Sequence, residues 1–163
     1  MPEALKILAV NPGTRYLGLA VFSGAELSNW EVKVLKGRWS KAKLQRIKEI
    51  LTEICDTYQP NVLAIKRLHP ARESINLHLL ALRIREFARK KGMKVCQYSI
   101  EEVKNFFLSQ GRKNKKGLAE IIASRHPELE NELKKEKENK NPYHLRMFEA
   151  VALGKICFHQ LDK

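Results

Sequence analysis

Two short apolar runs, each ending at a polar residue, constrain the fold of this chain most strongly. Residues 5–10 form the first run, which is apolar apart from Lys6 and ends at Asn11. Residues 62–65 form the second, which ends at Lys66. Strands that are apolar on both alternating faces are typical of sheets covered by helices on both sides. The sequence therefore predicts two central strands of an α/β sheet.

The remaining pattern supplies the other elements. Residues 16–22 and 29–34 follow turn signals and predict two further strands, the second half-buried because it alternates polar and apolar residues. Helical spacing and caps predict helices at residues 40–58, 73–91, 99–107, 117–125 and 143–160, with a short strand at 94–98. The charged stretch 130–141 predicts a solvated helix end or a mobile loop.

This order of elements predicts where a ligand would bind. Strands linked by helices are parallel and cross over right-handedly, so the first and fourth strands are expected to be central neighbours. Ligands in such sheets bind beyond the carboxyl ends of the strands. Those ends are Asn11 and Lys66, which are expected to lie side by side.

Net charge narrows the class of partner. A chain of 163 residues with a formal net charge of +13 carries more charge than solubility requires, which favours a nucleic-acid partner. A lysine-rich surface without such a partner stays the alternative. No apolar run approaches the ~20 residues of a membrane helix, and no signal peptide or paired cysteine spacing is found. We expect one domain, residues 1–163, that is cytoplasmic and does not bind membranes.

Residues 11–18, Asn-Pro-Gly-Thr-Arg-Tyr-Leu-Gly, resemble the first catalytic motif of the RuvC branch of the RNase H-like nucleases. The resemblance to RuvC-type Holliday junction resolvases extends over roughly residues 5–160. It implies an RNase H-like layered α/β fold: a mixed five-stranded sheet in the order 3-2-1-4-5 with helices on both faces. It also implies four acidic residues that hold two metal ions, which activate water and stabilise the leaving oxygen.

The four acidic positions of the family are occupied here by Asn11, Lys66, Arg146 and Glu149. Only Glu149 is an acid, so the formal charge of the four positions goes from four negative to one positive. Hard divalent cations require anionic oxygen ligands. We therefore expect no catalytic residues and no metal, with Mg²⁺ or Mn²⁺ relevant only if the site is rearranged. Lys66 and Arg146 could pair with Glu149, or could contact a phosphate in place of the metal ions.

Other basic residues match positions that the family uses on DNA. Val103-Lys104, Gly111 and Lys115 resemble a segment with a glycine-rich turn and a lysine facing the backbone, although Ser109 stands where a glycine is expected. His69 falls where resolvases place an aromatic near the junction centre. A solvated charge run and a surface histidine are the alternatives. The candidate nucleic-acid-binding residues are Lys66, His69, Arg72, Lys104, Arg112, Lys113, Lys115, Lys116 and Arg146.

Three functions stay open at this point. The first is a pseudo-nuclease, a nucleic-acid-binding module that recognises branched or structured DNA or RNA without cutting it. The second is an active structure-specific endonuclease that combines Glu149 with Glu101 or Glu102, although helix capping already explains those two residues. The third is a non-catalytic subunit, because resolvases of this type are dimers: a homodimer, or a heterodimer with an active homologue.

Overall fold

The computed structural model describes residues 4–108, 114–138 and 143–162. Five strands form one sheet in the order β3-β2-β1-β4-β5, which confirms the predicted order. The strands are β1 (Lys6–Asn11), β2 (Tyr16–Ser23), β3 (Glu26–Val34), β4 (Val62–Lys66) and β5 (Lys94–Tyr98). β1, β2 and β3 are antiparallel neighbours, whereas β4 runs parallel to β1 and β5 parallel to β4. The carboxyl ends of β1, β4 and β5 therefore lie at one edge.

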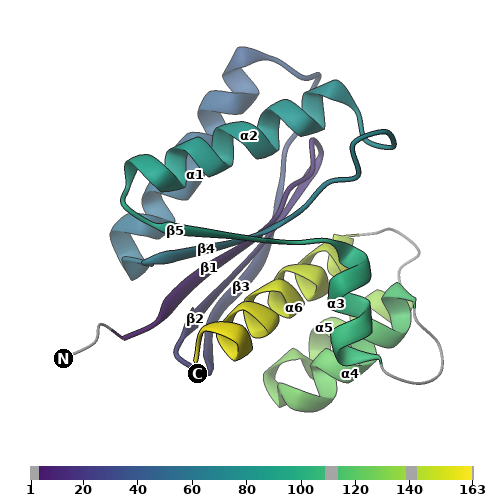
Figure 1. The fold of residues 1–163 in the computed structure, drawn as a ribbon. Helices are drawn as coiled ribbons and strands as arrows, with labels where there is room; N and C mark the ends of the chain where they lie inside the picture. The colour runs from purple at the N-terminus through teal and green to yellow at the C-terminus, as the bar shows by residue number, and fades with distance from the viewer. Residues whose placement is uncertain (1–3, 109–113, 139–142, 163) are drawn as a thin grey trace.

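Helices cover both faces of the sheet, as predicted (Figure 1). They are α1 (Lys41–Tyr58), α2 (Ile75–Lys90), α3 (Ile100–Phe107), α4 (Lys115–Arg125), α5 (Glu130–Glu138) and α6 (Tyr143–Leu161), with a 3₁₀ turn, η1 (Pro127–Leu129). The pair α1 and α2 lies on one face, and α3 to α6 lie on the other. In the described parts of the chain, no helix combines the length and the hydrophobicity needed to span a bilayer.

The two faces of β1 separate the core into two clusters. Ile7 and Ala9 belong to the cluster that includes the buried residues of α6, whereas Leu8 and Val10 belong to the cluster that includes those of α1 and α2. Successive side chains of a strand point to opposite faces, so a strand between two helical layers must be apolar at every position. The apolar run at residues 5–10 therefore predicts a central strand covered on both faces.

Serines begin three helices, two of them, α1 and α3, where the sequence predicts. The hydroxyl of Ser40 accepts a hydrogen bond from the Lys43 amide and begins α1. Ser99 begins α3 with the expected capping box, in which Glu102 bonds back to the Ser99 amide. Ser74 begins α2, so this helix starts at Ile75, two residues later than predicted.

The charged stretch after residue 130 is a helix in its own right, not a helix end or a loop over residues 130–138. Leu133 packs against the core, and Glu136 is buried. A carboxylate oxygen of Glu132 lies 3.0 Å from Nδ1 of His144 on α6. Tertiary contacts therefore stabilise a segment whose own apolar content is too low to indicate a packed helix. Residues 139–141 of the predicted stretch lie outside the described residues.

A row of alanines lets α6 lie close to the sheet. Ala9 pairs in register with Ala20 on β2 and with Ala64 on β4, so three small side chains cross the central strands. Gly154 of α6 packs there: a Cβ at this position would lie 2.5 Å from Cδ2 of Phe22 and 3.3 Å from Cβ of Ala9. The close approach brings the preceding turns of α6 against the end of β1.

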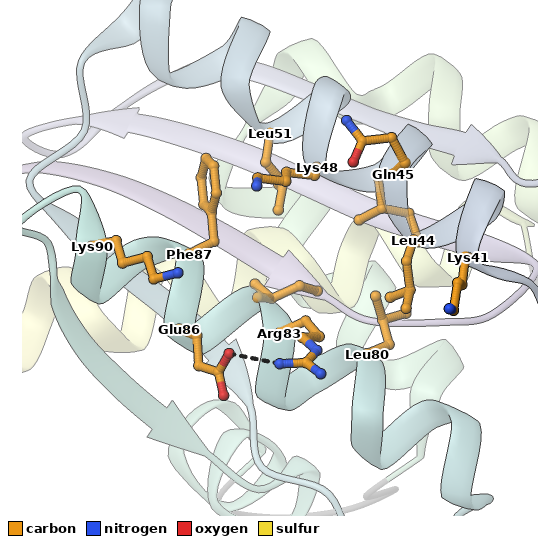
Figure 2. Close-up of a pocket in the computed structure, with 12 residues that line it drawn as sticks. Lys41, Leu44, Gln45, Lys48, Leu51, Leu80, Arg83, Glu86, Phe87 and Lys90 are labelled. Carbon is orange, nitrogen blue, oxygen red and sulfur yellow. Dashed lines mark hydrogen bonds and ion pairs between the residues drawn. The ribbon is translucent and has the colours of Figure 1, made fainter.

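On the opposite face, α1 and α2 leave a groove of about 300 Å³ between them (Figure 2). Leu44 and Phe87 line it, and Arg83 donates to Glu86 within it at 3.0 Å. Lys41, Lys48 and Lys90 also line the groove. The groove adds to the basic surface.

Replacing Gly154 by alanine tests the close seating of α6. Alanine is the better helix former by about 1 kcal/mol, yet its methyl group would collide with the Phe22 ring. Overpacking of this kind costs about 1–3 kcal/mol. We expect Gly154→Ala to lower the free energy of unfolding in urea melts. Gln160→Ala, on the exposed end of the same helix, serves as control, and a stabilised Gly154→Ala protein would contradict the close seating.

Candidate nucleic-acid interface at the strand ends

Asn11 and Glu149 meet at the end of β1. Asn11 is fully buried, and its Nδ2 donates to Oε2 of Glu149 at 2.6 Å and to the backbone carbonyl of Arg146 at 3.3 Å. Glu149 is only 2% exposed. A buried carboxylate requires hydrogen-bond donors or opposite charge around it. The amide at position 11 supplies a donor, whereas an aspartate there would supply a second negative charge.

Lys66 completes this arrangement from the neighbouring strand. It is the last residue of β4, and its Nζ lies 3.6 Å from Oε2 of Glu149. The Lys66 side chain is 13% exposed, so the ion pair is largely shielded from water. Such shielding strengthens the attraction between the two charges but also raises the cost of leaving either one alone. The structure thus contains the Lys66–Glu149 ion pair that the sequence suggested.

Arg146 lies against the turn that follows β1. Its Nη1 donates to the carbonyl oxygen of Pro12 at 3.5 Å, a long hydrogen bond. Two glycines of the first motif make room for it. A Cβ on Gly13 would lie 3.3 Å from Arg146 Nη1, and a Cβ on Gly18 would lie 2.8 Å from the carbonyl carbon of Arg146. Gly18 pairs in register with Asn11, so it lets the backbone of α6 reach the Asn11 amide.

The four positions predicted to lie together therefore do so, but their side chains do not fit a two-metal site. They supply one carboxylate, one amide and two cations, and Oε2 of that carboxylate already contacts Asn11 and Lys66. Among the residues that the structure describes, no three His, Cys, Asp or Glu side chains gather in a way that could hold a metal ion. Two-metal catalysis requires several anionic oxygens facing both ions.

Of the two acidic residues considered as substitutes, Glu102 has other partners. Glu102 accepts hydrogen bonds from the Ser99 amide at 3.3 Å and from Arg67 at 2.9 Å, as expected of a capping residue. Glu101 lies in the exposed first turn of the same helix. His144, five residues before Glu149 on α6, contacts Glu132 of α5.

The other predicted basic residues that the structure describes lie in the loop after β4 and on α3 and α4. His69 and Arg72 are exposed in the loop after β4, and His69 Nδ1 accepts a hydrogen bond from the Ala71 amide at 3.1 Å. Lys104 on α3 is half-buried, and Lys116 on α4 is exposed. Arg112 and Lys113 lie outside the described residues, as does the side chain of Lys115. Their roles in binding nucleic acid stay predictions.

Lys43 is a site-forming residue that the sequence interpretation missed. It is buried, and its Nζ donates to the carbonyl oxygens of Thr14 at 2.9 Å and Gly37 at 2.7 Å. It therefore ties the turn after β1 to the segment after β3. The signal was present in the sequence, because Lys43 lies four residues before Ile47 and so falls on the apolar stripe of α1.

Most of the chain resembles a known protein family. Residues 7–134 match the family model described as "Crossover junction endodeoxyribonuclease RuvC". The chain belongs to the RuvC family. The match ends before α6, so it does not include the Arg146 and Glu149 positions. No curated protein sequence matches the chain.

Solved structures extend the likeness over nearly the whole RuvC-like chain. Thermus thermophilus RuvC in complex with a Holliday junction substrate is 19% identical over 97% of this chain and 96% of that chain, with a TM-score of 0.71. Another T. thermophilus RuvC structure is 20% identical with the same coverage and TM-score. Fowlpox virus resolvase with substrate Holliday junction DNA is 16% identical over 98% and 100%, with a TM-score of 0.64. At these identities the likeness establishes the RNase H-like fold of the RuvC proteins.

Substituting aspartate for Asn11 tests the electrostatics of the site. The variant would place two carboxylates within hydrogen-bond distance, so the pKa of one of them should rise above its usual range. A raised pKa destabilises the fold above the ordinary carboxyl pKa of about 4, increasingly as the pH rises. We expect Asn11→Asp to lose about 2 kcal/mol at pH 7 and less at pH 5, measured by thermal melts.

The exposed Asn131→Asp substitution on α5 is the control for the change in net charge. It should leave the melting temperature nearly unchanged at both pH values. An Asn11→Asp protein as stable as the parent at pH 7 would show that Glu149 does not require a donor at this position.

Proposed function

We propose that this RuvC-family protein binds branched nucleic acid, with DNA as the first candidate, and does not cleave it. The observation that carries the proposal is the contact of Asn11 and Lys66 with the buried carboxylate of Glu149. In this arrangement the remaining acid is neutralised from within the protein. It is therefore a poor ligand for the divalent cations on which two-metal cleavage depends.

Charge supports binding. The chain has a formal net charge of +13, and Arg146 is a cation in excess of the Lys66–Glu149 ion pair at the end of the sheet where ligands of such folds bind. Lys104, Lys116 and Arg72 extend the basic surface, and the predicted contacts of Arg112, Lys113 and Lys115 would continue it. Lysines and arginines neutralise backbone phosphates irrespective of sequence. Contacts of this kind allow a protein to recognise the shape of a branch without contacts to the bases.

The comparisons support a branched substrate. The matched T. thermophilus RuvC and Fowlpox virus resolvase are each described in complex with Holliday junction DNA. This chain shares their fold over nearly its full length. We therefore place the four-way junction first among the substrates to be tested, followed by forked DNA and structured RNA.

Binding and cleavage can be measured in one experiment. We expect the purified protein to bind a four-way junction at low salt and to leave its strands uncut in Mg²⁺ or Mn²⁺. The logarithm of the binding constant should fall with the logarithm of salt concentration, with a slope of about −0.9 for each phosphate neutralised on duplex DNA. A linear duplex of equal length is the control for shape, and an active RuvC endonuclease is the control for cleavage.

Two results would contradict the proposal. Metal-dependent nicking that co-purifies with this protein, and that is lost in Glu149→Gln, would make it an enzyme. Equal affinity for junction and linear duplex at every salt concentration would leave only general binding by charge.

Replacing Lys66 by methionine separates its two possible roles. We assign Lys66 mainly to the ion pair with Glu149, because its side chain is largely shielded. Lys66→Met should therefore destabilise the fold by about 3–5 kcal/mol, the typical cost of a buried charge without its partner. Affinity for the junction should change less than twofold, measured well below the melting temperature of the variant. The double variant Lys66→Met/Glu149→Gln should recover stability, because the unpaired carboxylate is gone.

The opposite pattern would assign Lys66 to a phosphate. In that case Lys66→Met would melt like the parent protein but bind the junction at least tenfold more weakly.

A further inference from the structure

A surface cavity of about 510 Å³ lies beside the strand-end site. It is bounded by the turn after β1, the segment after β3 and the beginning of α2, so it is separate from the groove between α1 and α2 in Figure 2. Its lining includes Arg15, Tyr16, Lys36, Trp39 and Lys43. None of the described residues that line it is acidic. The volume falls within the range of about 300–1,000 Å³ that is typical of small-molecule sites.

Lys43 makes the wall of this cavity positive. The residue is largely buried, and its Nζ donates to the carbonyl oxygens of Thr14 and Gly37. Within the described parts of the chain, no carboxylate lies within ion-pair distance of it. Buried charges are normally paired. Here carbonyl dipoles hold the cation in place without cancelling its charge, and exposed Arg15 and Lys36 add to it.

An aromatic ring provides the second half of the chemistry. Trp39 is half-buried and packs against the core on the α1 side of the sheet, which holds its indole at the cavity. Tyr16 also lines the cavity, but its ring packs against the core cluster of the α6 side, so the stacking surface is the indole of Trp39. Indole rings are usual platforms on which nucleobases stack, and cations beside them hold the phosphate. A purely apolar ligand would not need these cations, and inorganic phosphate would not need the indole.

We propose that this cavity binds one unpaired nucleotide, with its base against Trp39 and its phosphate near Lys43, Arg15 and Lys36. Thr14, Arg15 and Tyr16 belong both to the cavity and to the segment that leaves Asn11. A strand bound at the strand ends can therefore place a base here. A free nucleotide carries the same base and phosphate as a nucleotide within a strand. That the bound nucleotide belongs to a strand rests on the proposed function. The cavity would favour branch points with an unpaired base.

Tryptophan fluorescence tests the proposal directly. The chain has two tryptophans, so Trp30→Phe leaves Trp39 as the sole reporter. This protein is titrated with a dinucleotide, with inorganic phosphate, with a fully paired four-way junction, and with the same junction carrying one unpaired nucleotide at the branch. We expect the dinucleotide and the unpaired junction to quench Trp39 saturably. Phosphate and the fully paired junction should not.

Variants measured by fluorescence anisotropy of labelled DNA provide the second readout. Trp39→Leu should weaken binding of the junction that carries one unpaired nucleotide (the unpaired junction) about tenfold, since one base stack is lost. Its affinity for the fully paired junction should not change. Trp39→Phe retains a ring and should bind within about threefold of the parent protein. Lys36→Gln should weaken the unpaired junction more than Arg38→Gln, because exposed Arg38 does not line the cavity.

The outcomes separate this proposal from the proposed function. Junction binding without any quenching of Trp39, or quenching by phosphate alone, would overturn the nucleotide site and leave the binding function intact. Quenching by the dinucleotide without junction binding would support the site and overturn the function. Equal losses for paired and unpaired junctions in Trp39→Leu would also overturn the site.

Discussion

The hydrogen bond from Asn11 to Glu149 is the interaction on which the rest of this structure depends. Helix α6 lies close to the sheet because alanines cross the central strands and Gly154 faces Phe22. That closeness places the carboxylate of Glu149 in the interior, where a charge without partners is very costly. Asn11 meets this need from β1, and Lys66 meets it from β4. The packing of α6 against the sheet therefore requires the contacts that Asn11 and Lys66 make with Glu149.

These contacts of Glu149 change what the strand ends can bind. Within a fold shared with RuvC, the carboxylate of Glu149 contacts Asn11 and Lys66, and Arg146 adds a cation beside this pair. Buried Lys43 has the same character, because its partners are carbonyl oxygens and no carboxylate of the described residues reaches it. Buried positive charge therefore lies at this edge of the sheet in addition to the exposed basic side chains. This is the charge distribution that the proposed binding of nucleic acid requires.

The sequence predicted the architecture well because its central strands carry an unambiguous signal. Burial on both faces requires apolar residues at every position, and β1 and β4 satisfy this over most of their length. The meeting of Asn11 with Lys66 follows from parallel neighbours that end together. Helix α5 was not predictable in the same way, because Leu133 packs against a core built from other elements and Glu132 contacts His144 of α6. The carbonyl partners of Lys43 likewise exist only once the turns are folded.

The most direct test of the central claim is the metal content of the strand ends. Crystals soaked in manganese, with anomalous diffraction recorded at a wavelength where manganese scatters strongly, would show any bound ion beside Glu149. The account predicts no anomalous peak there, with Asn11 and Lys66 still in contact with the carboxylate. One or two manganese ions coordinated by Glu149, with Lys66 displaced, would contradict it.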